Sequence, residues 1–306
     1  MLTTNEIKYI LQKHTPKPVF YIIYIIWLKV ILRVVNFYNS IRLYFFTKEM
    51  FKTFHHHNVT FDILLNPNNG TVDNEIYLHK VYEPYFLSII KRELKEGDTF
   101  VDIGANIGQH SLFASACVGV NGKVISFEPI PRIYDQFLSS IKENIKNARE
   151  SYSNISVHNL GCGESNKTLN IYSNNKNMGG SSLINMGQST SHTEIKIVKA
   201  DSFLEKLKKI DFIKIDVEGY EYYALLGLQE TIQKYKPKIF LEYSLDAYNY
   251  TAESPDRNHG KLILDLLFTH GYTVYDLEDN DKVLDTDSFD NYMQNKISQT
   301  NLLCKI

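Results

Sequence analysis

The central part of the chain alternates short apolar runs with longer amphipathic stretches. Strand-like apolar runs occupy residues 99–104, 123–127, 155–160, 211–217 and 238–242. Apolar residues recur with helical spacing in the segments that separate the first three runs. They do so again between the fourth run and the fifth. Apolar strands separated by helices predict an α/β fold with a mostly parallel sheet covered on both faces. Ligands bind such sheets at the carboxyl ends of the strands.

A different pattern occupies residues 15–48. Residues 19–28 form an uninterrupted apolar run, and polar residues then recur with helical spacing at Lys29, Arg33, Asn36 and Ser40. No acidic residue occurs between Lys8 and Lys48. A helix with a wide apolar face and a basic stripe suits the surface of an anionic membrane. A helix packed on its own domain or on a second subunit, and a membrane-spanning anchor, are the alternatives. No small-residue cleavage site follows the run, which argues against a removable signal peptide.

The two patterns suggest a domain boundary. We expect residues 1–73 to form an N-terminal extension and residues 74–306 to form the main domain, with a helix over 74–95 at its start. The segment 162–205 is too long for a plain connection between two strands. We interpret it as a hairpin over the ligand pocket, with a surface excursion as the alternative.

Composition narrows the classes of protein. The chain has 306 residues, of which 43% are hydrophobic and 22% charged, so it is a globular protein. Its net charge of −2 provides no positive field for a nucleic-acid backbone, and no nucleic-acid partner is expected. The three cysteines are widely spaced, which favours a reducing compartment and a cytoplasmic location. Nothing in the composition indicates the oligomeric state.

The loop after the first strand indicates the kind of ligand. A dinucleotide site needs three glycines in the pattern G-x-G-x-x-G, but this loop runs from Gly104 to Gln109 with Asn106 and Gln109 at the second and third glycine positions. No phosphate-binding G-x-x-x-x-G-K-[ST] motif occurs either. S-adenosylmethionine lacks a pyrophosphate and fits better. The backbone at Gly104 and Gly108 would approach its methionine tail, and Glu128, at the end of the second strand, would accept hydrogen bonds from its ribose hydroxyls.

Three motifs, in this order and spacing, resemble a known family. The sequences Asp-Ile-Gly-Ala-Asn-Ile-Gly over 102–108, Phe-Glu-Pro over 127–129 and Phe-Ile-Lys-Ile-Asp-Val-Glu-Gly-Tyr-Glu over 212–221 are similar to FkbM-type methyltransferases. The resemblance covers residues 95–245. It implies the Rossmann-like class I methyltransferase fold, a seven-stranded sheet whose last strand is antiparallel, with residues 272–277 and 301–306 as the final pair. It also implies the cofactor S-adenosylmethionine, bound by Asp102, Gly104, Asn106, Gly108, Glu128, Pro129 and Asp216.

The chemistry of methyl transfer indicates the catalytic candidates. The enzyme must align the methyl donor with the acceptor, and a hydroxyl acceptor also needs a base. Asp216, Glu218 and Glu242 are the candidates, and the sequence does not order them. A metal-assisted reaction would use the same carboxylates with Mg²⁺, but no motif requires a metal.

Structural roles are the alternative for several of these residues. Lys214 lies in the middle of a strand, two residues before Asp216, so both belong to one face and can form a buried ion-pair cluster. Asp102 can cap the glycine-rich turn.

Three functions remain open from the sequence. The favoured one is O-methylation of a hydroxyl on a glycan or a small molecule. The second is methylation of a protein or an RNA by the same fold. The third is a non-catalytic binding module, against which the intact motif residues argue.

Overall fold

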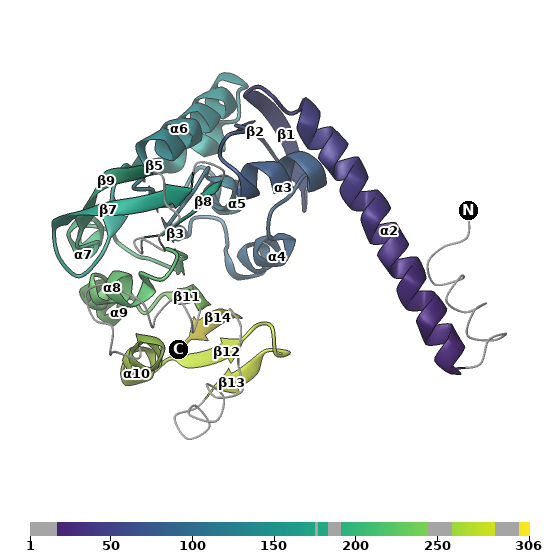
Figure 1. Cartoon of the computed structure of the whole chain (residues 1–306). Helices are drawn as coiled ribbons and strands as arrows, with labels where there is room; N and C mark the ends of the chain where they lie inside the picture. Colours follow the sequence, from purple (N-terminus) through teal and green to yellow (C-terminus); the bar gives the residue numbers. More distant parts are fainter. Residues whose placement is uncertain (1–16, 175–176, 183–190, 244–258, 285–299) are drawn as a thin grey trace. The chain divides into compact units, whose positions relative to one another are not determined.

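A computed structural model describes residues 17–174, 177–182, 191–243, 259–284 and 300–306 (Figure 1). Residues 15 and 16, the first two of the apolar segment 15–48, lie outside the described residues. The chain divides into two compact units between Lys48 and Glu49. The boundary expected at residue 73 therefore differs from that of the structure, and residues 49–73 belong to the larger unit.

The smaller unit contains the helix α2 (Lys17–Phe45). The helix contains all four residues of the predicted polar stripe. Within the stripe, the Ser40 hydroxyl donates a hydrogen bond of 2.8 Å to the Asn36 carbonyl one turn earlier. Taken by itself, α2 leaves large apolar side chains exposed, among them Val34 at 62% and Phe37 at 69%. In the described part of the chain, no helix has both the length and the apolar character needed to cross a membrane.

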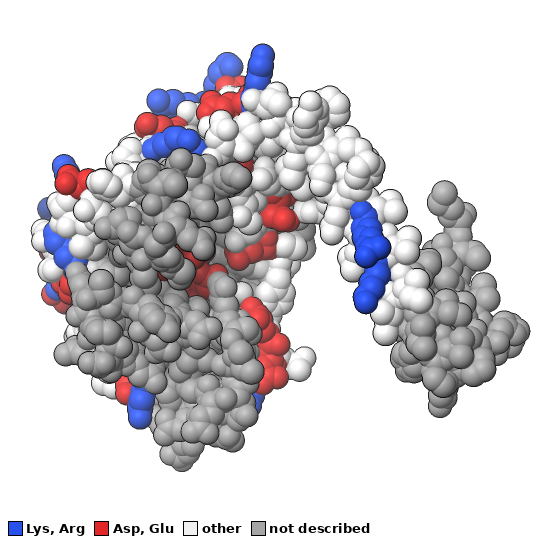
Figure 2. Space-filling model, in the orientation of Figure 1, with Lys and Arg blue, Asp and Glu red and all other residues white. Residues whose placement is uncertain are grey.

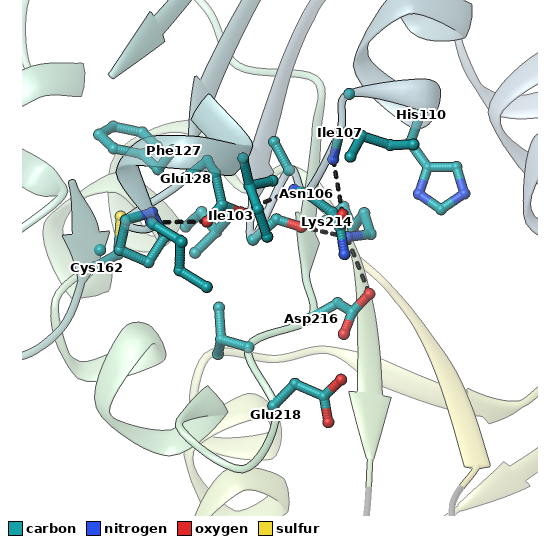
Figure 3. Close-up of a pocket in the computed structure, with 18 of the residues that line it drawn as sticks. Ile103, Asn106, Ile107, His110, Phe127, Glu128, Cys162, Lys214, Asp216 and Glu218 are labelled. Carbon is teal, nitrogen blue, oxygen red and sulfur yellow. Dashed lines mark hydrogen bonds and ion pairs between the residues drawn. The ribbon is translucent and has the colours of Figure 1, made fainter. Parts of the chain in front are cut away.

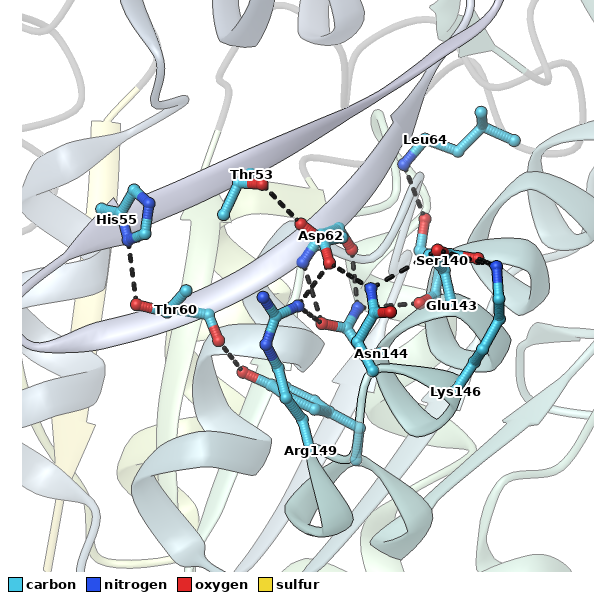
Figure 4. A network of polar contacts seen from close by, with 12 residues as sticks. Thr53, His55, Thr60, Asp62, Leu64, Ser140, Glu143, Asn144, Lys146 and Arg149 are labelled. Carbon is cyan, nitrogen blue, oxygen red and sulfur yellow. Dashed lines mark hydrogen bonds and ion pairs between the residues drawn. The ribbon is translucent and has the colours of Figure 1, made fainter.

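The larger unit begins with the hairpin of β1 (Met50–His56) and β2 (Val59–Leu65). Polar contacts join this hairpin to α6 (Pro131–Lys146), as Figure 4 shows. The Asn144 side chain accepts a hydrogen bond from the Asp62 backbone N–H at 2.8 Å and donates one to the Asp62 carbonyl at 2.6 Å. Phe54 and Phe61 are buried beneath the hairpin. These contacts explain why residues 49–73 belong to the main unit.

The central sheet confirms the predicted fold class. Its eight strands are, in spatial order, β13 (Lys282–Leu284), β12 (Thr273–Asp276), β14 (Thr300–Lys305), β11 (Lys238–Tyr243), β10 (Phe212–Ile215), β3 (Thr99–Ile103), β4 (Lys123–Phe127) and β5 (Ile155–His158). The strands from β11 to β5 are parallel, and β14 runs antiparallel between β11 and β12, as expected. The short β13 adds an eighth strand to the seven that the sequence predicts.

Helices connect these strands. They are α5 (Gln109–Val118), α6, η1 (Glu150–Asn154), α7 (Asp201–Leu204), α8 (Glu221–Leu226), α9 (Gln229–Tyr235) and α10 (His259–Thr269). The helix expected over 74–95 is two helices, α3 (Thr71–His79) and α4 (Pro84–Glu93). Pro84 accounts for the break, because proline restricts the residue before it and lacks an N–H. The turn between the helices brings Tyr82 and Glu83 out of a helical conformation.

The two faces of the central strands differ in chemistry. One face buries aliphatic side chains such as Ile103, Ile215 and Leu241 against α8, α9 and α10. The other face carries Phe100, Phe212 and Phe240, two of which contact Phe86 of α4. Because side chains alternate along a strand, two residues further on this second face presents Asp102, Lys214 and Glu242. The polar cluster therefore lies on one face, next to the carboxyl ends of the strands.

The segment after β5 forms a second sheet, with the strand order β6 (Gly161–Cys162), β9 (Ser191–Val198), β7 (Lys167–Asn174) and β8 (Asn177–Ser182). Strands β7 and β9 are an antiparallel pair. Their side chains Ile171, Ile195 and Ile197 line the cavity described below. The predicted hairpin over the pocket is thus confirmed.

Candidate active site

A cavity lies at the carboxyl ends of β3, β4, β10 and β11, beside the point where the strand order reverses. It encloses about 1070 Å³, part of which is open to solvent. Residues 103–110, 127–130, 214 and 216–218 line it (Figure 3), together with Glu242. The second sheet supplies the apolar wall. A concave site with an apolar wall and a few polar groups is typical of a pocket for a small ligand.

The glycine-rich loop adopts a conformation that its glycines require. Gly104 and Gly108 have φ values of +82° and +87°. A Cβ at Gly104 would lie 1.9 Å from the Asp216 carbonyl oxygen, and one at Gly108 would lie 2.1 Å from the Phe137 ring. The glycines therefore allow the loop to pack closely on β10 and α6, which leaves its other side and the start of α5 facing the cavity.

Glu128, directly after β4, is hydrogen-bonded to the glycine-rich loop. Its Oε2 accepts a hydrogen bond of 3.0 Å from the Asn106 N–H, and its Oε1 accepts one of 2.8 Å from the Ile130 N–H. Each oxygen keeps a lone pair for a further donor. Burial raises the pKa of Glu128 to about 7, which the two backbone donors only partly offset. A diol donating to both oxygens would restore the charged form.

An ion-pair cluster lies beneath the loop. The Lys214 ammonium, 1% exposed, donates a hydrogen bond of 3.0 Å to the Gly104 carbonyl and lies 3.4 Å from Asp102 Oδ1 and 3.1 Å from Asp216 Oδ2. Burial alone would lower the pKa of Lys214, but the two carboxylates raise it above its ordinary value. Lys214 is therefore a fixed positive charge that joins β3, β10 and the loop.

Asp102 occupies the far side of this cluster. It is fully buried, accepts a hydrogen bond of 2.6 Å from the Ser111 hydroxyl, and does not line the cavity. Burial raises its pKa, against the effects of Lys214 and Ser111. Asp102 thus supports the loop from behind, the structural role that the sequence left open. The other residues proposed for the site, from Gly104 to Glu242, all line the cavity.

The three catalytic candidates have different proton affinities. Burial would raise the pKa of Asp216, but Lys214 and a hydrogen bond from Glu242 hold it below its ordinary value. Burial and then the Asp216 carboxylate raise the pKa of Glu242, so Glu242 keeps the proton of this pair. Desolvation, followed by Asp216 and Glu221, raises the pKa of Glu218 to about 7. Glu218 is the most solvent-exposed of the three.

The backbone around the cavity is strained. Asn106 and Glu218 line it with φ values of +52° and +53°, and Glu83, beside it, has φ +46°. Non-glycine residues rarely adopt this conformation, which costs about 1–3 kcal/mol each and clusters at functional sites. At Glu218 the turn is held by Glu221, whose Oε1 accepts hydrogen bonds of 3.1 Å from Val217 N–H and Gly219 N–H.

Among the cavity residues that the sequence does not predict are Tyr82 and His110. The apolar pattern places Tyr82 in a continuous helix, and Pro84 is the signal that could reveal the turn. His110 had no distinguishing motif, because it is one residue of a helix that follows the glycine-rich loop. Among the described residues, no group of three or more His, Cys, Asp or Glu side chains is arranged to hold a metal ion.

A family model matches the part of the chain that contains most of the residues lining the cavity. The methyltransferase FkbM domain matches residues 102–274, more than half of the chain. The chain belongs to this family of S-adenosylmethionine-dependent methyltransferases. The match contains the glycine-rich loop, Glu128 and all three catalytic candidates. It does not contain Tyr82 and Glu83.

Individual relatives are more distant. The hexuronic acid methyltransferase AglP of Haloferax volcanii is 27% identical over 149 residues, which cover 48% of this chain and 56% of AglP. A protein-L-isoaspartate O-methyltransferase of Methanococcus aeolicus is 39% identical over 51 residues, 17% of this chain and 24% of the relative. The chain thus spans about half or less of the length of these relatives.

Solved structures show the same pattern of partial similarity. A methyltransferase FkbM from Methylobacillus flagellatus has 19% identity and a TM-score of 0.46, and the alignment covers 76% of this chain and 52% of that one. Aeropyrum pernix fibrillarin, solved with natively bound S-adenosyl-L-methionine, has 11% identity and a TM-score of 0.40, with 84% of this chain and 99% of that one covered.

Proposed function

We propose that this chain transfers a methyl group from S-adenosylmethionine to a hydroxyl group of a glycan or small molecule. The observation that carries the proposal is the cavity itself, which brings the glycine-rich loop, Glu128 and the carboxylates of β10 and β11 to one place. Family membership supports the cofactor, and the relative named as a hexuronic acid methyltransferase supports a sugar acceptor.

The residues present fit this cofactor. Glu128 has a free lone pair on each oxygen for the two ribose hydroxyls. The loop from Gly104 to Gly108 and the first turn of α5 would receive the methionine carboxylate. Pro129, Cys162 and Ile197 supply apolar surface beyond Glu128 for the adenine. When bound, the cofactor supplies an electrophilic methyl group on a cationic sulfur.

The carboxylates then divide the remaining tasks. We assign the base to Glu218, because a pKa of about 7 lets it accept a proton near neutral pH. Glu218 would take the hydroxyl proton as the acceptor oxygen receives the methyl group that the cofactor would supply. Asp216 stays charged and, with protonated Glu242, orients the acceptor.

Two measurements test the proposal. Calorimetry should show S-adenosylmethionine binding that Glu128→Ala weakens by about 1.5–3 kcal/mol, since charge-assisted hydrogen bonds are lost. Glu143→Gln, which changes a carboxylate paired with Lys146 on α6, is the control and should bind normally. A screen with methyl-labelled cofactor should then label hydroxyl compounds. Absence of binding by the folded wild-type protein, or label only on protein or RNA, would contradict the proposal.

We further propose that α2 lies on an anionic membrane surface. Its apolar side chains are exposed, it has basic residues at Lys29 and Arg33, and Figure 2 shows basic side chains together along this helix. Apolar burial would supply most of the affinity and each basic residue about 1 kcal/mol on an anionic surface.

Vesicle co-sedimentation of the full chain tests this second proposal. Binding should increase with anionic lipid and decrease with salt, and the double variant Lys29→Gln/Arg33→Gln should lose the dependence on anionic lipid. Protein that stays in solution with both lipid compositions would overturn the proposal. Co-sedimentation that depends on neither salt nor lipid charge would indicate that α2 inserts into the bilayer instead.

A further inference from the structure

The turn between α3 and α4 supplies a wall of the cavity from outside the matched family region. Tyr82 lines the cavity, and Gln109 at the start of α5 holds its backbone from both sides. The Tyr82 N–H donates to Gln109 Oε1 at 2.9 Å, and Gln109 Nε2 donates to the Tyr82 carbonyl at 2.7 Å. Gln109 is itself buried. The turn is therefore held in place before any ligand arrives.

His110 follows Gln109 and carries a nitrogen without a hydrogen-bond partner. His110 is 6% exposed and lines the cavity. Its ring packs edge-on against the Phe86 ring, with 4.8 Å between the ring centroids, and is stacked on the Tyr82 ring, with 6.1 Å between the centroids. Nε2 makes no hydrogen bond, and Glu83 Oε2 lies 3.5 Å away. Burial lowers the pKa of His110 to about 3, so the ring is neutral near pH 7. An unpaired buried nitrogen costs free energy that a ligand can recover.

Glu83 lies beside the cavity, next to His110, and its side chain is hydrogen-bonded by Tyr82. It occupies the N-cap position of α4, yet its side chain makes no capping hydrogen bond. Desolvation and then the Asp216 carboxylate raise its pKa to about 7. The Glu83 carboxylate also contributes to the raised pKa of Glu218, so the two carboxylates interact electrostatically.

This part of the cavity is short of positive charge. Among the lining residues that the structure describes, Lys214 is the one lysine or arginine, and it is committed to Gly104, Asp102 and Asp216. Asp216 is paired with Lys214, whereas Glu83 and Glu218 form no ion pair with a lysine or arginine of the described residues. A ligand here must bring its own donors and its own positive charge.

We propose that Glu83, His110 and Glu218 form an acceptor wall that selects a hydroxyl compound bearing an ammonium group, such as an amino sugar, and disfavours uronates and sugar phosphates. The inference rests on the proposed function and names its substrate class. The ammonium donates to the Glu83 carboxylate and to His110 Nε2, which leaves a neighbouring hydroxyl for Glu218.

The test compares three probes of similar size on the full chain saturated with S-adenosylhomocysteine. Glucosamine, N-acetylglucosamine and glucuronate are titrated calorimetrically at pH 8, where Glu83 is ionised. Glucosamine should bind at least about tenfold more tightly than N-acetylglucosamine, the size of one charge-assisted contact, and glucuronate most weakly. Glu83→Gln and His110→Phe should each reduce the advantage of glucosamine about fivefold or more. Glu143→Gln should leave it unchanged.

Each result has a clear meaning. Equal affinity for the three probes, no binding of any of them, or tighter binding of glucuronate overturns the acceptor wall. Unchanged preference in Glu83→Gln and His110→Phe that still bind S-adenosylhomocysteine overturns it as well, and that binding also reports whether the variants fold. If folded wild-type protein fails to bind S-adenosylhomocysteine, the proposed function fails instead. Methyl transfer to glucuronate would support the proposed function and contradict the acceptor wall.

Discussion

The larger unit contains two groups of carboxylates whose surroundings shift their pKa values in opposite directions. In the first, Asp62 of β2 receives hydrogen bonds from Thr53, Asn147 and Arg149 (Figure 4). Burial would raise the pKa of Asp62, but these donors lower it below its ordinary value. In the second group, at the cavity, Glu83, Glu128 and Glu218 all have pKa values raised to about 7.

The difference separates structure from function. Around Asp62, donors from β1 and from the loop after α6 satisfy the carboxylate, so the contacts stabilise the fold as it stands. At the cavity, backbone N–H groups and Lys214 satisfy only part of the acceptor capacity. Desolvated carboxylates without donors cost free energy unless a ligand supplies the donors. The carboxylates of the cavity are therefore suited to binding a ligand, whereas the Asp62 network stabilises the fold.

The largest effect should follow from removing the cation of the cavity. Lys214→Met leaves Asp102 and Asp216 without their buried partner, and we expect the free energy of unfolding to fall by about 3–5 kcal/mol. Urea denaturation measures it. Lys209→Met is the matched control, because Lys209 is 48% exposed and its pairs with Asp98 and Asp211 are screened by solvent. Similar losses in both variants would show that the buried cluster is unimportant for stability.

Replacing the base should reduce turnover without reducing stability. Glu218→Gln is expected to lower turnover about 10²-fold, because the proton acceptor is lost. The melting temperature should change little, since Glu218 is exposed to solvent. Initial rates with saturating cofactor and thermal unfolding provide the two measurements. Full turnover would exclude Glu218 as the base, and Asp216→Asn would then be tested as its replacement.

The Asp62 network should show the reverse behaviour. Asp62→Ala removes three hydrogen bonds and leaves Arg149 without its ion-pair partner, which should cost about 2 kcal/mol of unfolding free energy. Affinity for S-adenosylmethionine should not change in the folded variant. Denaturation and calorimetry on the same preparation check both statements. A loss of cofactor affinity comparable to that of Glu128→Ala would contradict the separation of the two regions.

Sequence alone predicts the frame of the site well, because local patterns determine it. The positions of Gly104, Gly108 and Glu128 follow from strand ends and from a loop whose backbone only glycine allows. The alternation of Phe212, Lys214 and Asp216 along one strand similarly places the charges on one face.

The parts that escaped prediction depend on contacts between distant segments. Tyr82 reaches the cavity because Gln109, 27 residues later, holds its backbone. The hairpin of β1 and β2 joins the larger unit because Asp62 meets Asn144, 82 residues away. The order of proton affinities among Asp216, Glu218 and Glu242 depends on burial and on the position of Lys214, which no spacing in the sequence provides.

The smallest expected effect is a pH dependence of cofactor binding. Glu128 has a pKa of about 7 in the free protein, and donors from the ribose would favour its charged form, so binding should release a proton when Glu128 starts protonated. Affinity should therefore rise with pH, by about tenfold between pH 6 and pH 8 for one group with this pKa. Calorimetry at several pH values measures the slope, and Glu128→Gln should flatten it because the amide does not titrate. Asp62→Asn should keep the full slope, since the pKa of Asp62 is already lowered and the group stays charged throughout this range. A slope that persists in Glu128→Gln would assign the titration to another group of the protein or of the cofactor, and the ribose contact of Glu128 would have to be abandoned.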